Sequence, residues 1–126
     1  MEHPWLVPYP TDVSPCIDVC SMDSPVVMAT GACRGHTHRP AFTHLGITLT
    51  YAEFERLAGP FRSALQATLG PCKGERITLI LPNCLQVPVV LFGSWRTGMV
   101  VVIVNPPYTA GEVAFQLQAG AVECVA

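Results

Sequence analysis

Residues 73–112 of the chain read KGERITLILPNCLQVPVVLFGSWRTGMVVVIVNPPYTAGE, and this stretch decides the fold. Within it, residues 77–81 (ITLIL) and 100–104 (VVVIV) are short apolar runs that end at proline and asparagine. Runs of this kind are typical of strands that are buried on both faces of a parallel sheet. The segment between them closes at Gly98 and is long enough for a crossover helix.

A second helix and a third strand extend this unit. Thr109 and Glu112 have the spacing of a capping box, in which each side chain satisfies the free backbone N–H of the other residue. Residues 122–125 are the next strand candidate. The order β-α-β-α-β predicts an α/β fold, and the small number of strands predicts an incomplete N-terminal part of a doubly wound domain.

The same capping signal occurs earlier in the chain, at Thr50 and Glu53. Apolar residues then recur at steps of three and four and predict an amphipathic helix that ends at Gly70. These apolar residues are Phe54, Leu57, Ala58, Phe61, Leu65 and Leu69. Pro60 lies inside the pattern and predicts either a kink or a later helix start, because proline removes one backbone hydrogen bond.

A small hairpin is predicted ahead of this helix. Residues 41–44 and 47–49 flank the turn pair Leu45-Gly46. Repeated prolines make residues 1–40 an extended arm, and residues 25–31 support one or two helical turns at most. We therefore divide the chain into the arm, residues 1–40, and a truncated subdomain, residues 41–126.

These motifs resemble the AMP-forming acyl-CoA synthetases, or adenylate-forming ligases. Residues 49–54 (LTYAEF) are similar to the first core motif of that family, and residues 96–106 are similar to the second. The long-chain-fatty-acid–CoA ligase branch is resembled more closely, through residues 81–83 (LPN), Phe92-Gly93, residues 98–101 (GMVV), residues 104–106 (VNP) and Tyr108-Thr109. Trp5 and Tyr9-Pro10 resemble the N-terminal segment of that branch.

The resemblance implies a two-step reaction in the full-length enzyme. A fatty acid carboxylate attacks the α-phosphorus of Mg²⁺-bound ATP, giving acyl-adenylate and pyrophosphate, and the thiol of coenzyme A then displaces AMP. In the family, the phosphate loop, the ribose-binding acid, the adenine-contacting segment and the catalytic lysine lie downstream of residue 126. The resemblance therefore implies an N-terminal fragment that is inactive alone and binds none of these cofactors.

The residues themselves agree that this chain lacks phosphoryl-transfer groups. Lys73 is the only lysine and precedes a strand, and no Gly/Ser/Thr-rich loop is present. We therefore assign no catalytic, cofactor-binding or metal-binding residue. Half of the 126 residues are apolar and 13% are charged, which predicts exposed apolar surface and self-association of the chain in isolation. The net charge of −2 gives no electrostatic case for nucleic acid.

Two other functions are compatible with part of the sequence. A β-α-β unit can belong to a dinucleotide-binding oxidoreductase, but the turn after the first strand, residues 81–86 (LPNCLQ), lacks the G-x-G-x-x-G pattern. A non-catalytic binding module with this fold is the other alternative. Nucleotide titration tests the first, and pull-down with a complete homologue tests the second.

Several polar residues stand where a ligand could bind. Tyr108, Thr109, Asn83 and Asn105 follow strands, at the edge where α/β sheets bind ligands, but capping and turn formation explain them without a ligand. Capping also accounts for Glu53. His44 has no nearby partner in the sequence to form a catalytic pair.

The six cysteines show no paired zinc-binding pattern. Cys33, His36 and His38 form the one plausible metal cluster, and a further ligand would be needed. We interpret the cysteines as reduced, mostly buried, small apolar residues of a cytoplasmic protein without a secretory signal. Residues 85–104 are strongly apolar, but Arg96 interrupts them, so a helix followed by a strand is favoured over a membrane span. Peripheral membrane association is implied by the resemblance alone.

Overall fold

A computed structural model describes residues 10, 12–14, 16–70, 72–122 and 124–125. The elements in chain order are the 3-10 helix η2 (Val19–Ser21), α1 (Pro25–Gly35), β1 (Pro40–His44), β2 (Ile47–Thr50), α2 (Tyr51–Leu69), β3 (Arg76–Leu79), α3 (Gln86–Thr97), β4 (Val100–Ile103), α4 (Ala110–Ala119) and β5 (Cys124–Val125). The resemblance drawn from Trp5 and Tyr9 lies outside the described residues.

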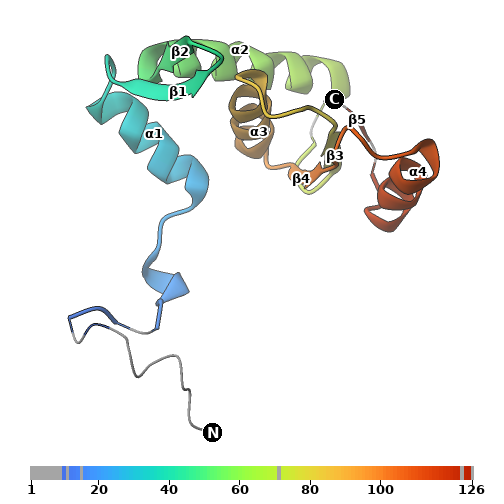
Figure 1. Ribbon diagram of the computed structural model, residues 1–126, viewed down its shortest axis with the longest axis horizontal. Helices are drawn as coiled ribbons and strands as arrows, with labels where there is room; N and C mark the ends of the chain where they lie inside the picture. Colours follow the sequence, from blue (N-terminus) through green and yellow to red (C-terminus); the bar gives the residue numbers. More distant parts are fainter. Residues whose placement is uncertain (1–9, 11, 15, 71, 123, 126) are drawn as a thin grey trace, which may run out of the picture.

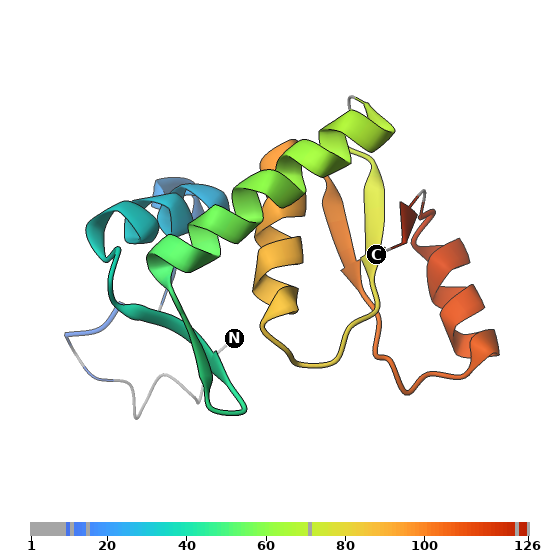
Figure 2. The same cartoon turned by 90° about the horizontal axis from the view of Figure 1, so that it is seen from above.

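Strands β3, β4 and β5 form a parallel sheet in the order β4-β3-β5. Ile77 of β3 pairs with Val101 of β4 on one edge and with Cys124 of β5 on the other. Helix α3 leads from β3 to β4, and α4 leads from β4 across to β5. The two helices lie on opposite sides of the strands (Figures 1 and 2). This arrangement confirms the predicted β-α-β-α-β order and the α/β fold.

The predicted hairpin is also confirmed. β1 and β2 pair antiparallel, and His44 faces Ile47 across a two-residue turn. Leu45 and Gly46 both have positive φ, 48° and 79°, as the tightest hairpin turns require. A side-chain hydrogen bond of 2.9 Å between Thr43 and Thr48 links the strands next to the turn.

Helix α2 begins and ends where the sequence predicts. The Thr50 N–H donates to Oε2 of Glu53 at 2.9 Å, and the Glu53 N–H donates to Oγ1 of Thr50 at 3.3 Å. The helix ends at Gly70, which has a φ of 75° and donates its N–H to the carbonyl of Gln66. Because the helix runs from Tyr51 through Pro60 without interruption, the expected alternative of a later start is wrong.

The expectation of at most two helical turns within residues 25–31 is wrong as well. Helix α1 has 11 residues and extends to Gly35. Ser24 accepts a hydrogen bond from the Val27 N–H, and Pro25 occupies the first helical turn, where its missing N–H costs nothing. Tertiary burial of Cys33 against Phe54 offsets the low helix propensity of the glycines.

Two apolar clusters make up the core. In the first, Cys33, Phe54 and Ala58 are buried, and the rings of Phe42 and Phe92 meet Phe54 edge-on at 5.2 and 5.4 Å. The second cluster lies between the end of α2 and the sheet. Its members are Cys72, Ile77 and Met99, packed with Leu65, Val101 and Cys124. Helices α2 and α3 cover this side of β3.

Close contact between α2 and α3 depends on one glycine. A Cβ atom placed on Gly93 would lie 2.6 Å from Cδ1 of Phe61 and 3.3 Å from the carbonyl oxygen of Ala58. The first separation is too short for any side chain, so a larger residue would push the helices apart. Gly93 therefore sets the distance between α3 and the middle of α2.

The outer strand β4 is less buried than the sequence predicts. Ile77, Thr78 and Leu79 of β3 are at most 1% exposed, as expected for a strand covered on both faces. In β4, by contrast, Val100 is 49% exposed and Ile103 is 65% exposed. The expectation that both strands are buried on both faces is therefore right for β3 and wrong for β4, which forms an edge of the described sheet.

The apolar segment at residues 85–104 forms α3 and then β4, as predicted. A helix long and apolar enough to cross a membrane does not occur among the described residues.

The capping boxes make a contribution to the stability of the fold that depends on pH. The Thr50 N–H, and then its hydroxyl, hold the pKa of Glu53 below its ordinary value. This contribution is complete above the unfolded-state pKa of glutamate and is lost as pH falls through the lowered pKa of the folded state. We expect helix content, followed by circular dichroism, to fall on acidification over that range. Glu53→Gln should flatten this part of the curve, because glutamine retains the cap without titrating.

A pair of threonine substitutions measures how much the cap contributes to the free energy of unfolding. Thr50→Ala should lower the free energy of unfolding by about 1 kcal/mol, whereas Thr48→Ala, which removes only the exposed hydrogen bond to Thr43, should cost less. Equal losses would show that the Thr50 cap is worth no more than one exposed hydrogen bond.

Candidate functional site

The carboxyl ends of β3 and β4 lie at the same edge of the sheet because the strands are parallel. The segments that follow them line an open cavity of about 470 Å³. Its lining comprises residues 81–83 after β3 and residues 103–108 at the end of β4 and beyond. This is the edge at which open α/β sheets bind ligands. The structure thus brings Asn83, Asn105 and Tyr108 to one cavity.

The chemistry of this cavity is neutral. Two carboxamides and one phenol are its polar side chains, and the rest of the lining is apolar or proline. Such groups can orient a ligand through hydrogen bonds, but they supply no charge to a phosphate or a metal ion. The cavity therefore suits an uncharged, partly apolar part of a substrate.

Thr109 and Glu112 follow this cavity, and the structure places them in a capping box. The Thr109 N–H and hydroxyl both donate to Oε2 of Glu112, at 2.8 and 2.7 Å. The hydroxyl first, and then the N–H, hold the pKa of Glu112 below its ordinary value. The capping interpretation is confirmed, and the same holds for Glu53 at the start of α2.

Lys73 lies at the opposite edge of the sheet. It belongs to the turn before β3, and the N–H of the neighbouring Gly74 donates to the carbonyl of Gly98, just ahead of β4. The four residues of β3 separate this turn from the cavity by roughly 13 Å, at about 3.3 Å per residue. Lys73 is thus too far away to neutralise a charge at the carboxyl edge.

A buried ion pair was missed by the sequence reasoning. The guanidinium of Arg96 on α3 donates two hydrogen bonds to the carboxylate of Glu55 on α2, at 3.0 and 2.6 Å. A third, longer bond of 3.4 Å reaches Oγ1 of Thr30 on α1. The Arg96 side chain is 8% exposed and that of Glu55 is 45% exposed. The pair joins α1, α2 and α3 at one point.

Sequence alone offered one indirect signal for this pair. Arginine in a strongly apolar helix is almost never buried without a partner. The partner lies 41 residues away, so no local spacing rule identifies it. The pair also borders an open groove of about 1210 Å³ between α1, α2 and α3, which Arg62 and Lys73 line as well.

The three residues considered as a candidate metal cluster, Cys33, His36 and His38, are not brought together. Cys33 lies on α1 and is buried against Phe54 and Ala58 of α2, and burial, followed by the charge of Glu55, raises the pKa of its thiol. The His36 ring lies 6.1 Å from the ring of Tyr51, and His38 is exposed. Across the described part of the chain, no three histidine, cysteine or acidic side chains are grouped closely enough to hold a metal ion.

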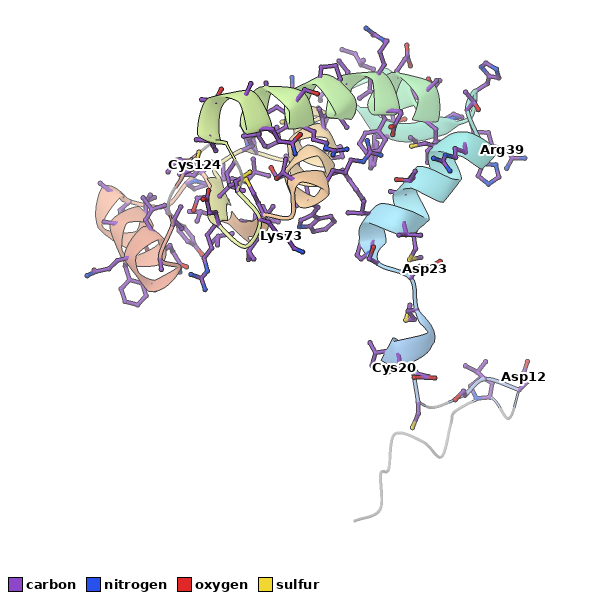
Figure 3. The ribbon with its side chains drawn as sticks, turned by 180° about the vertical axis from the view of Figure 1, so that it is seen from behind. Asp12, Cys20, Asp23, Arg39, Lys73 and Cys124 are labelled. Carbon is purple, nitrogen blue, oxygen red and sulfur yellow. The ribbon has the colours of Figure 1, made fainter. Side chains whose placement is uncertain are left out.

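The expectation that the cysteines are mostly buried is wrong. Cys33 and Cys72 are buried, Cys84 and Cys124 are half-buried, and Cys16 and Cys20 are exposed; all are free thiols in the described structure. Figure 3 shows Cys20 on the segment that leads into α1, far from Cys124 at the sheet. The reason is that α1 and β1 carry the chain onto the body only after residue 24, so the earlier cysteines remain in water.

His44 does have neighbours that its sequence context does not reveal. It is half-buried at the end of β1 and lines a cavity of about 230 Å³ together with Asn83 and Cys84, from the loop after β3. The hairpin thus packs beside the carboxyl edge of the sheet. No sequence signal links residues so far apart in the chain.

Comparison with known proteins identifies relatives of this chain. The model of the AMP-binding enzyme family matches residues 30–126. A long-chain-fatty-acid–CoA ligase of Yersinia pestis is 42% identical over 126 residues, which is 99% of this chain and 22% of the relative. The corresponding ligase of Haemophilus influenzae is 38% identical over the same shares. The chain thus spans about a fifth of the length of these relatives.

Solved structures agree with these sequence relationships. The inhibitor-bound N-terminal domain of FACL13 from Mycobacterium tuberculosis superimposes with a TM-score of 0.75 and 27% identity, over 82% of this chain and 26% of that one. The N-terminal subdomain of NpsA from Klebsiella oxytoca gives a TM-score of 0.79 over the same shares, at 15% identity. The second likeness concerns the fold alone.

The Arg96–Glu55 pair predicts an asymmetric response to substitution. Glu55→Ala leaves a nearly buried guanidinium without its carboxylate, and we expect a loss of roughly 2–3 kcal/mol, less than for a fully buried pair because Glu55 is half-exposed. Arg96→Met leaves a carboxylate that water can solvate and should cost less. The double variant should be more stable than Glu55→Ala in urea unfolding, with exposed Arg62→Met as a near-neutral control. A double variant less stable than both single variants would contradict this account.

The thiols should react in two classes. In the folded chain we expect Cys16 and Cys20 to react rapidly with a thiol reagent at pH 8, and Cys33 and Cys72 to react slowly. Burial and the raised pKa both slow Cys33. In denaturant, all six thiols should react without prior reduction, and metal analysis should find no stoichiometric zinc. One zinc per chain, lost in the Cys33→Ser variant, would overturn this prediction.

Proposed function

The chain belongs to the AMP-binding enzyme family, and from this premise we propose that it forms the N-terminal part of a long-chain-fatty-acid–CoA ligase. The observation that carries the proposal is the alignment of 99% of the chain, at 42% identity, with 22% of such a ligase. The likeness to the N-terminal domain of FACL13 supports the same position within a longer enzyme.

The proposed whole enzyme forms an acyl-adenylate from a fatty acid and ATP, releasing pyrophosphate, and then an acyl-CoA, releasing AMP. The described residues do not fit the ATP and Mg²⁺ that this reaction uses. The cavity at the carboxyl edge is neutral, Lys73 lies at the other edge, and Arg96 is occupied by Glu55. We therefore assign the chain a scaffold role and assign it no chemical step.

The proposal extends to partners and location. Fatty acid and coenzyme A are the substrates of the whole enzyme, which we place in the cytoplasm and in peripheral contact with a membrane. Residues 1–40 act as an N-terminal arm and residues 41–126 as part of the adenylation domain. In isolation, the chain self-associates through its exposed apolar residues.

The proposed function predicts that the isolated chain is inactive and that a chimeric ligase containing it is active. The isolated chain, given ATP, Mg²⁺, a fatty acid and coenzyme A, should release no pyrophosphate above a heat-treated control, because it supplies no phosphate-binding groups. A chimera of the Yersinia pestis ligase, with its aligned segment replaced by residues 1–126, should form acyl-CoA within about tenfold of the parent rate, or about 1.4 kcal/mol of barrier.

The parent ligase lacking its aligned segment is the matched control and should be inactive. Turnover by the isolated chain would contradict the scaffold role. A folded chimera without ligase activity would contradict the proposed function and would favour a binding module that retains the fold.

A further inference from the structure

The open groove between α1, α2 and α3 concentrates positive charge on a chain whose net charge is −2. Arg62, Lys73 and Arg96 line this groove, and Glu55 is the one carboxylate in its lining. Glu55 neutralises Arg96 through two hydrogen bonds. Among the described residues, neither Arg62 nor Lys73 forms an ion pair. Two exposed cations therefore line the groove without a counter-charge.

One side of the groove is a row of residues along α2. Gly59, Arg62 and Gln66 recur at steps of three and four, which places them on one face of the helix. Gly59 leaves the row without a side chain at this point, and a Cβ atom added there would meet nothing within 4 Å. Arg62 therefore lies beside space that a ligand can occupy.

Lys73 lies in the turn before β3, beside the end of α3 (Figure 3). A Cβ atom on Gly98, the C-cap of α3, would lie 2.9 Å from Cγ of Lys73 and 3.3 Å from its Cβ. Any larger residue at Gly98 would displace the stem of the lysine. The Gly74 N–H also donates to the Gly98 carbonyl at 2.9 Å, which ties the turn to the end of the helix. Because the stem of Lys73 is held, its ammonium group loses less conformational entropy when it binds an anion.

The groove also has an apolar part, lined by Trp95 and Met99 together with Val26 of α1. The ring of Trp95 is half-buried and meets the ring of Phe92 edge-on at 5.2 Å, which fixes its orientation. Two cations beside an indole ring suit a ligand that carries a phosphate group on a flat apolar ring, since cations bind phosphate and aromatic rings stack. The groove volume of about 1210 Å³ is ample for such a small molecule.

We propose that this groove, here called the phosphate groove and defined by Arg62, Lys73, Trp95 and Met99, binds an organic phosphate that carries an aromatic ring. Arg62 and Lys73 bind the phosphate, and Trp95 packs against the ring. The phosphate groove lies towards the amino edge of the sheet, whereas the neutral cavity that Tyr108 lines lies at the carboxyl edge. Binding there requires no turnover and is independent of the proposed ligase function.

Phenyl phosphate is the simplest probe of the phosphate groove. In a Trp5→Phe background, Trp95 is the one tryptophan of the chain, and its fluorescence should change saturably with a dissociation constant of about 1 mM or lower. The titration uses protein dilute enough to be monomeric by light scattering and excitation above the absorption of the probe. Inorganic phosphate, which lacks the ring, and phenol, which lacks the charge, should each bind at least about tenfold more weakly.

Substitution of the two cations tests which residues bind the phosphate. Arg62→Gln and Lys73→Gln should each weaken the binding of phenyl phosphate at least about fivefold. Arg56→Gln is the matched control, because Arg56 is an exposed arginine of the same helix outside the groove lining, and it should leave binding unchanged. Lys73→Arg keeps the charge and should retain binding.

A second pair of variants fills the groove without removing a charge. Ser63→Leu places a larger side chain in the lining and should weaken binding, whereas Ala64→Leu, at the next exposed residue of α2, lies outside the lining and should not. An absence of saturable binding, or equal dissociation constants for Arg56→Gln and the two cation variants, would overturn the phosphate groove. Equal affinities for phenyl phosphate and inorganic phosphate would overturn the role of Trp95. A chimera that binds phenyl phosphate but lacks ligase activity would overturn the proposed function alone.

Discussion

The burial of three consecutive residues of β3 is the constraint on which the rest of the described structure depends. Ile77, Thr78 and Leu79 are excluded from water, so their backbone groups need partners on two edges and their side chains need cover on two faces. β4 and β5 provide the edges, and α2 with α3 covers the face that carries Ile77. The strand order is therefore β4-β3-β5. The crossovers through α3 and α4 each lead to a strand that pairs with the central strand β3.

Two contacts hold helices α2 and α3 together on the covered side of the sheet. Gly93 lets α3 approach α2 so closely that the ring of Phe61 occupies the space where a side chain would be. One turn further along α3, the Arg96 guanidinium binds the Glu55 carboxylate and also reaches Thr30. The first contact sets the separation of the helices, and the second sets their register and attaches α1. A charge at this depth is tolerated because its partner is half in water and the guanidinium donates three hydrogen bonds.

Features that arise from neighbours in the sequence were predictable, and features that arise from distant residues were not. The capping boxes at Thr50 and Thr109, the turn at Leu45-Gly46 and the end of α2 at Gly70 each depend on a few adjacent residues. The length of α1 depends instead on the burial of Cys33 under α2, and the Arg96–Glu55 pair spans 41 residues. The cavity at the carboxyl edge was predictable as a location, since strand ends mark it, whereas the proximity of His44 was not.

The positions of the charged groups show that the described cavity lacks cations. Ligands of α/β sheets bind at the carboxyl edge, and there the chain offers Asn83, Asn105 and Tyr108. Its lysine lies in the turn before β3, and its buried arginine is bound to Glu55. A reaction that develops charge on phosphate at this cavity would therefore need cations that the cavity's own lining does not supply.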